Sequence, residues 1–102
     1  MLCDEPEATI ETKESLYLIA QEALHNTAKH ARASSVVMKL RNDAQWITLD
    51  ISDNGVGFDP EGDFPGHLGL RSMRERTSRL QGTLTLETAE GKGTRISARI
   101  PL

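Results

Sequence analysis

Apolar residues recur every three to four positions between Ile10 and Ala31, and this spacing predicts one long amphipathic helix. The apolar stripe consists of Leu16, Ile19, Ala20, Ala23, Leu24, Thr27, Ala28 and Ala31. At about 100° per residue, the side opposite this stripe is polar and carries Glu22, His25, Asn26 and Lys29. Glu11 and Glu14 suit the first turn, because acidic side chains are favoured near the positive end of a helix dipole.

The rest of the chain alternates between strand and helix patterns. Apolar and polar residues alternate within four short segments, which predicts strands at 36–40, 46–51, 84–86 and 96–100. A second helical stripe comprises Leu70, Met73, Thr77 and Leu80, and Gly82 is typical of a helix stop. Residues 59–66 contain two prolines and two glycines and are expected to form a loop.

The predicted order of elements is helix, strand, strand, loop, helix, strand, strand. Strands joined by short turns pair antiparallel, and apolar helix faces must cover one face of the sheet. We therefore expect an α/β (α+β) fold, a two-layer sandwich with a mixed, mostly antiparallel sheet covered on one face by helices. Residues 10–102 would form this single domain, and the acidic residues 1–9 would form a linker or tail.

Composition narrows the functional classes. The net charge of -3 over 102 residues argues against a nucleic-acid surface. One cysteine, Cys3, permits no internal disulfide and favours a reducing compartment, so a cytoplasmic location is expected. No apolar run approaches the length of a membrane span and no signal peptide is visible, so we expect no membrane contact by this domain. The parent protein could still be membrane-anchored.

The segment Asp53-Asn54-Gly55-Val56-Gly57-Phe58 directly follows a predicted strand. A carboxylate at a strand end can accept a hydrogen bond from an exocyclic amine such as that of adenine. Its two glycines allow the backbone to turn and to pass close to a ligand. Taken alone, Asp-Asn-Gly is also a common turn sequence, so the interpretation depends on the segments around it.

Polar residues on the first predicted helix offer complementary chemistry. Glu22 can orient or deprotonate a nucleophile, the amide oxygen of Asn26 can ligate Mg²⁺, and Lys29 can offset phosphate charge. A solvated helix face is the simpler interpretation of these three residues. The glycines of Gly66-His67-Leu68-Gly69-Leu70 lead into the second helix, where exposed backbone N–H groups favour phosphate. The alternative interpretation is a loop with a stop signal before the helix.

The order of these segments resembles that of the GHKL ATP-binding superfamily. Gln21–Ala31 is similar to its N box, Asp53–Phe58 to its G1 box, and Gly93-Thr94 to its closing GT motif. Gly66–Leu70, running into Met73-Arg74-Glu75-Arg76, resembles the G2 box of one class of bacterial sensor histidine kinases, the class associated with nitrate and nitrite sensing. The fold implied by this resemblance is the Bergerat sandwich, which agrees with the predicted order of elements.

The resemblance covers about residues 14–102 and implies a role for each matching residue. Glu22 would assist transfer near the γ-phosphate, Asn26 would ligate the Mg²⁺ that bridges the ATP phosphates, and Asp53 would bind the adenine amine. The other implied nucleotide-binding positions are Lys29 facing the phosphates, Gly55 and Gly57 beside the nucleotide, Gly66 and Gly69 as lid hinges, Leu70, and Thr94 near Asp53 through water.

The function implied is that of a histidine protein kinase catalytic domain. It would donate the γ-phosphate of ATP to a histidine on a separate dimerisation domain, and the full-length kinase would work with a response regulator. Only His25 partly fits the pattern of an acceptor histidine, and it lies inside the N box, so self-phosphorylation is not expected. No two-helix hairpin precedes residue 10, so we expect an excised domain whose dimerisation part lies upstream.

Three other functions remain open at this stage: a non-kinase GHKL ATPase, a serine-kinase anti-sigma factor, and a degenerate nucleotide-binding module without turnover. The segment 59–65 is short for the lid of a gyrase- or chaperone-type motor, and no transducer domain is visible. Phe58 and Phe64 do not clearly replace the separate phenylalanine box of larger kinase classes. The segment Met73-Arg74-Glu75-Arg76 favours the histidine kinase over the anti-sigma factor, and the intact motif residues argue against a degenerate module.

Overall fold

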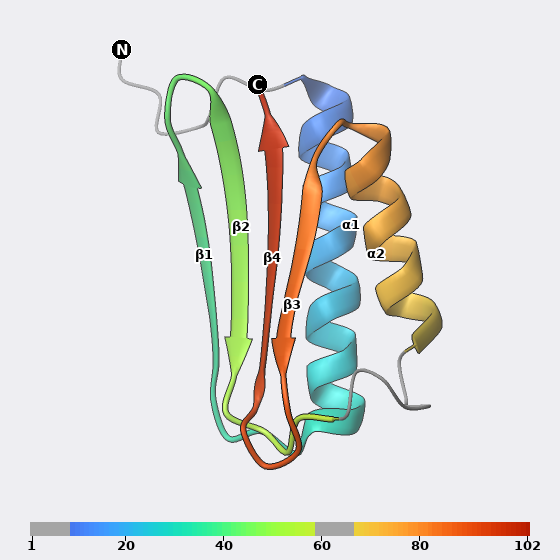
Figure 1. The fold of residues 1–102 in the computed structure, drawn as a ribbon, viewed down its shortest axis with the longest axis vertical. Helices are drawn as coiled ribbons and strands as arrows, with labels where there is room; N and C mark the ends of the chain where they lie inside the picture. The colour runs from blue at the N-terminus through green and yellow to red at the C-terminus, as the bar shows by residue number, and fades with distance from the viewer. Residues whose placement is uncertain (1–8, 59–66) are drawn as a thin grey trace.

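The fold has two layers, a pair of helices and a four-stranded sheet (Figure 1). The computed structural model describes residues 9–58 and 67–102, without the side chains of residues 30, 31 and 67. In chain order the elements are α1 (Ile10–Asn26), the π-helical turn η1 (Thr27–Ala31), β1 (Val36–Asn42), β2 (Trp46–Asp53), α2 (His67–Arg79), β3 (Thr83–Thr88) and β4 (Thr94–Pro101). The predicted fold class and element order are confirmed, while the predicted loop at 59–66 lies outside the described residues.

Helix α1 begins at a threonine cap and ends in an unexpected turn. The Oγ1 atom of Thr9 accepts a hydrogen bond from the backbone N–H of Thr12 at 3.1 Å, which satisfies a donor that a helix start leaves unpaired. The helix runs to residue 31 as predicted, but η1 is π-helical, and the following Arg32 has a left-handed φ of 52°. A π turn holds more residues than an α turn, so Ala28 leaves the predicted stripe and is exposed.

The strand order in the sheet is β1-β2-β4-β3, and all three pairings are antiparallel. β1–β2 and β3–β4 are hairpins, whereas the central pair β2–β4 joins the two halves of the chain. In that pair Asp53 lies opposite Thr94, and Trp46 lies opposite Pro101. The sequence prediction allowed a mixed sheet, but the described strands contain no parallel pair.

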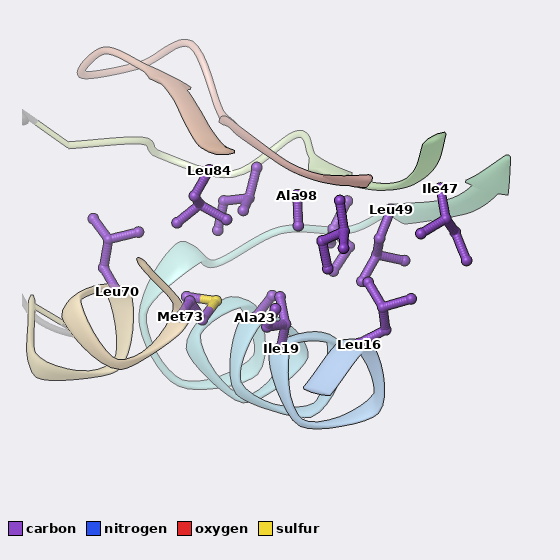
Figure 2. Packing of buried hydrophobic residues seen from close by; sticks show 12 residues of the cluster. Leu16, Ile19, Ala23, Ile47, Leu49, Leu70, Met73, Leu84 and Ala98 are labelled. Carbon is purple, nitrogen blue, oxygen red and sulfur yellow. The ribbon is translucent and has the colours of Figure 1, made fainter. Parts of the chain in front are cut away.

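The hydrophobic core fills the space between the two layers (Figure 2). Its buried side chains come from α1, α2 and the three strands that the helices cover: Leu16, Ile19, Ala23, Ile47, Leu49, Ile51, Leu70, Met73, Leu84, Ile96, Ala98 and Ile100. Burial of one of these leucine, isoleucine or methionine side chains contributes about 1.5–3 kcal/mol. Thr77 is also buried, and its hydroxyl donates to the Met73 carbonyl at 2.8 Å, so this polar group is satisfied within the helix.

Strand β1 extends beyond the helix layer, and every one of its residues is exposed (Figure 1). Met38 and Leu40 pair with the buried Ile51 and Leu49, so they point to the same side of the sheet as the core. They remain 47% and 52% exposed because the helices pack against β2, β3 and β4, whereas β1 is the edge strand at the far side of the sheet. The strand prediction for this segment is confirmed, but its alternating pattern does not correspond to a buried face.

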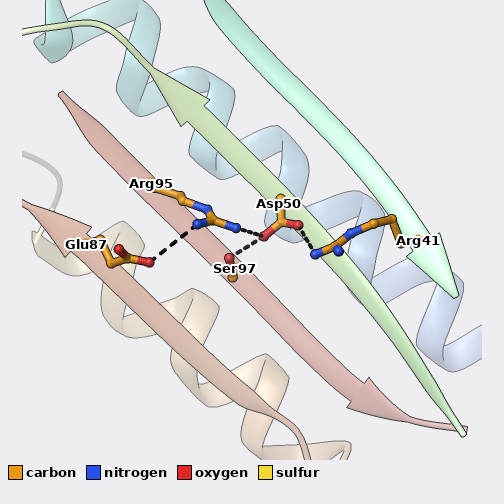
Figure 3. A network of polar contacts seen from close by, with 5 residues as sticks. All are labelled: Arg41, Asp50, Glu87, Arg95 and Ser97. Atoms are coloured by element: carbon orange, nitrogen blue, oxygen red, sulfur yellow. Dashed lines mark hydrogen bonds and ion pairs between the residues drawn. The ribbon is translucent and has the colours of Figure 1, made fainter.

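A network of charged side chains crosses the sheet on the face opposite the helices (Figure 3). Asp50, whose side chain is 8% exposed, accepts a hydrogen bond from Arg41 at 2.6 Å and lies 3.4 Å from Arg95. It also accepts a short hydrogen bond from the Ser97 hydroxyl, and Arg95 reaches Glu87 at 3.7 Å. Burial opposes ionisation of Asp50, but the hydrogen bonds from Ser97 and Arg41 and the charges of Arg41 and Arg95 lower its pKa below 3.8.

The Asp50→Asn variant is expected to be less stable than the unaltered chain by on the order of 1 kcal/mol at neutral pH. Charge-assisted hydrogen bonds are lost, but Arg41 and Arg95 are half-exposed, so solvent screens part of the interaction. Because the folded state lowers the pKa of Asp50, its stabilisation is present above about pH 4 and is lost as the pH falls through the folded-state value. Urea unfolding at pH 7, 4 and 2 should show the difference narrowing; a constant difference would contradict this assignment.

Candidate nucleotide site

Asp53 ends the central strand β2 and is held by groups from two other segments. Its Oδ1 accepts a hydrogen bond from the backbone N–H of Gly55 at 2.8 Å, and its Oδ2 accepts one from the Thr27 hydroxyl at 3.2 Å. The strand register places Thr94 opposite Asp53 across β4. The carboxylate is half-buried and fixed in orientation, at a position where a ligand's donor can meet it.

The glycines after Asp53 permit a close approach of two backbone segments. Gly57 has a φ of 62°, and a Cβ at this position would overlap the carbonyl oxygen of Ala89 in the β3–β4 turn. Gly93 has a φ of 77°, and a Cβ there would overlap the carbonyl oxygen of Asp53. The loop after β2 and the β3–β4 turn therefore pack backbone against backbone at one end of the sheet, which is the lower end in Figure 1.

Gly57→Ala is expected to destabilise the domain by about 1–2 kcal/mol, with Gly91→Ala as the matched control. Both positions have positive φ, which disfavours any residue with a Cβ, but a Cβ on Gly91 would meet no atom within 4 Å. Alanine at Gly57 must also displace the Ala89 carbonyl, so thermal unfolding should show the larger loss for Gly57→Ala. Equal losses would mean that the overlap with Ala89 is relieved without cost.

Two polar residues that the sequence interpretation missed hold these loops. The Asn54 amide oxygen accepts hydrogen bonds from the N–H groups of Ser34 and Ser35, both at 3.0 Å, and its nitrogen donates to the Ser34 hydroxyl at 2.8 Å. The Thr88 hydroxyl accepts from the Phe58 N–H at 3.2 Å and lies 3.0 Å from Thr94 Oγ1. Asn54 carried a weak signal as the middle residue of Asp-Asn-Gly, but its partners lie about 20 positions away.

A hollow of about 470 Å³ lies beside Asp53 and Thr94, within the size range of small-ligand sites. It is lined by residues of β2, β3, β4 and the β3–β4 turn: Ser52, Asp53, Glu87, Thr88, Ala89, Lys92, Gly93, Thr94 and Arg95. Lys92 and Arg95 bring positive charge to it, and Glu87, which pairs with Arg95 at 3.7 Å, brings negative charge. The sequence interpretation assigned no role to either cation.

The polar face of α1 lies at a second hollow, of about 340 Å³, between α1 and α2. Glu22 is half-buried there, and a Cβ on Gly69 of α2 would overlap its carboxylate. Asn26, one turn along α1, is half-buried, and its amide has no hydrogen-bond partner among the described residues. Lys29 lies in η1 and is exposed. Of these three predicted residues, Glu22 lines the second hollow, which is separate from the hollow beside Asp53.

The segment predicted to resemble a G2 box is only partly described. Gly66 lies outside the described residues, whereas Gly69 lies in the first turn of α2 rather than in a loop. Leu70 is buried in the core. The absence of a Cβ on Gly69 lets α2 pack closely against the side chain of Glu22. Hinge or ligand-contact roles for Gly69 and Leu70 remain predictions.

Comparison with known proteins gives a consistent family. The family of histidine kinase-, DNA gyrase B-, and HSP90-like ATPases matches residues 11–102. Over 88 residues the chain is 42% identical to a protein of Brevibacillus brevis named signal transduction histidine-protein kinase/phosphatase DegS. This match covers 86% of the present chain and 23% of the relative. The chain spans about a quarter of the length of the curated relatives it matches first.

Two solved structures share the fold. The histidine kinase domain of the blue-light activated kinase EL346 from Erythrobacter litoralis superposes with a TM-score of 0.75 at 29% identity, over 97% of this chain and 48% of that chain. The ATP binding domain of PrrB from Mycobacterium tuberculosis gives a TM-score of 0.69 at 29% identity, over 86% of this chain and 67% of that chain. Neither helix in the described part of the present chain has the length and apolar character to cross a membrane.

Proposed function

The chain belongs to the family of histidine kinase-, DNA gyrase B-, and HSP90-like ATPases, and from this we propose that it is the ATP-binding catalytic domain of a two-component sensor histidine kinase. It binds ATP with Mg²⁺ and donates the γ-phosphate to a histidine on a separate dimerisation domain. The observation that carries this proposal is the Asp53 carboxylate, held by Gly55 and Thr27 at the end of β2.

Adenine recognition follows from the chemistry of Asp53. Each carboxylate oxygen has room for about two hydrogen bonds, and the protein supplies one to each, from Gly55 and from Thr27. One acceptor position on each oxygen is left for the exocyclic amine of adenine. Guanine presents a carbonyl oxygen at the same ring position, so two acceptors would face each other. Thr94, opposite Asp53, would reach the base through water.

The phosphate end of the nucleotide is assigned to the polar face of α1. Mg²⁺, when bound, offsets the charge of the phosphate oxygens. The ion would take one ligand from the amide oxygen of Asn26 and the others from phosphates and water. This fits the half-buried Asn26 amide, which is without a partner in the described structure. Lys29 adds positive charge one turn further.

The remaining assigned residues shape the path of the nucleotide. Gly55 and Gly57 keep the loop after β2 narrow, and Gly66, Gly69 and Leu70 are assigned to the lid and its hinge. Glu22 is assigned to the transfer step, where it positions or deprotonates the incoming histidine. The acceptor histidine is assigned to the separate dimerisation domain. That domain would have to hold the histidine in line with the γ-phosphate, because such positioning supplies much of the rate.

The wider setting of the domain follows from the same proposal. The full-length kinase would join this domain to a dimerisation and phosphoacceptor domain, pass the phosphoryl group to a response regulator, and act in the cytoplasm. Assignment to the nitrate- and nitrite-sensing class rests on the segments Gly66–Leu70 and Met73–Arg76.

Asn26→Ala tests the metal assignment. The variant is expected to fold normally, because the side chain lies off the apolar stripe, and to lose roughly tenfold or more of its Mg²⁺-dependent ATP affinity. Calorimetric titration of ATP with and without Mg²⁺ measures the effect, with Gln45→Ala, an exposed amide in the β1–β2 turn at the other end of the sheet, as control. Asn26 would instead be structural if the variant unfolds, and the proposed function would fail if the unaltered chain binds no ATP.

A further inference from the structure

The hydrogen bond between Thr27 and Asp53 joins two segments that the sequence separates by 26 positions. Thr27 is the first residue of η1, at the end of α1, and Asp53 is the last residue of β2. The contact therefore joins the end of the helix layer to the end of the central strand, where the candidate adenine site lies.

The position of Thr27 would ordinarily be apolar. It continues the stripe of Leu16, Ile19 and Ala23, which faces the sheet, and lies four residues after Ala23. At this point the strand beneath the helix ends in Asp53, not in another aliphatic residue. A valine at this position would have a methyl group in place of the hydroxyl and nearly the same shape. The hydroxyl of Thr27 therefore adds one specific feature, a hydrogen-bond donor to Oδ2 of Asp53.

Resting on the proposed function, we propose that Thr27 is a positioning residue for adenine recognition. The terminal torsion of an aspartate is broad, so a carboxylate held at one oxygen can still turn. The Gly55 N–H holds Oδ1 and the Thr27 hydroxyl holds Oδ2, which fixes the plane of the carboxylate before the base arrives. Thr27 acts through Asp53, and its contribution depends on the exocyclic amine that Asp53 receives.

The test compares Thr27→Val, which keeps the shape of the side chain, with Thr27→Ser, which keeps the hydroxyl. Calorimetry with ATP-Mg²⁺ should show roughly two- to tenfold weaker binding for Thr27→Val, the fold-change that corresponds to one hydrogen bond, and near-normal binding for Thr27→Ser. Purine riboside triphosphate lacks the exocyclic amine, so the unaltered chain and Thr27→Val should bind it equally. In an Asp53→Ala background, Thr27→Val should cause no further loss.

Other outcomes separate the inference from the function on which it rests. Unchanged or tighter ATP binding by Thr27→Val, with Asp53→Ala still impaired, would overturn the role of Thr27 alone. The same loss for the amine-free triphosphate, or a loss that persists without Asp53, would show that Thr27 only packs the helix end. Thermal unfolding of each variant checks that it is folded, and absence of ATP binding by the unaltered chain would overturn both proposals.

Discussion

Replacing Glu22 by glutamine is expected to slow phosphoryl transfer to the acceptor histidine by about 100-fold or more, while ATP affinity changes by less than about twofold. Glu22 lies in the hollow between α1 and α2, apart from the Asp53 hollow where the base is assigned. Glutamine keeps the size of the side chain beside Gly69 but cannot take up a proton. The loss should therefore fall on the transfer step.

Transfer can be measured with radiolabelled ATP, first with this chain alone and then with the acceptor-histidine domain supplied as a separate chain. The chain alone should carry no stable phosphohistidine. Glu75→Gln is the matched control, because Glu75 is an exposed glutamate of α2 paired only loosely with Arg71 at 3.4 Å. Acid-labile label on the isolated chain, abolished by His25→Ala, would contradict the separation of nucleotide site and acceptor.

Asp53→Asn is expected to weaken ATP binding by about 1.5–3 kcal/mol, the range for a hydrogen bond to a charged group, which corresponds to roughly 10- to 150-fold. Asparagine keeps an acceptor but loses the charge, and its amide must be turned to offer oxygen to both Thr27 and the base. The preference for ATP over GTP should narrow in the variant, because the amide nitrogen can donate to the guanine carbonyl.

Calorimetric titration of the unaltered chain and the variant with ATP and with GTP gives both quantities. Asp43→Asn makes the same chemical change in the β1–β2 turn, at the other end of the sheet, and should leave nucleotide affinity unaltered. Equal affinities of the unaltered chain for ATP and GTP would defeat the assignment of Asp53 to the adenine amine.

The elements of the fold could be predicted because each depends on a local period. A period near 3.6 identified both helices and a period of 2 identified all four strands. The burial of those elements could not be predicted in the same way, because it depends on how far the helices reach across the sheet. Met38 and Leu40 have the pattern of a buried face and are half-exposed, since the helix layer ends before β1.

The site was predictable where a motif stands in consecutive residues, and not where partners meet across the fold. Asp53 and the glycines after it were found from one short segment. Thr27 was placed on the apolar side of its helix, which is the correct face, but nothing local reveals that this face ends over Asp53. Asn54 and Thr88 were missed for the same reason, because their hydrogen-bond partners are distant in sequence.

The strand order also has a consequence for how the chain folds. The segments α1–β1–β2 and α2–β3–β4 repeat one arrangement, and each contains a hairpin that can close locally. The central β2–β4 pairing closes a much longer loop, which is entropically the costly step. The rate-limiting event is therefore expected to be the pairing of β2 with β4, which joins the two preformed halves α1–β1–β2 and α2–β3–β4. Because Asp53 and Thr94 pair at one end of these two strands, the candidate adenine site would be completed only as the two halves join.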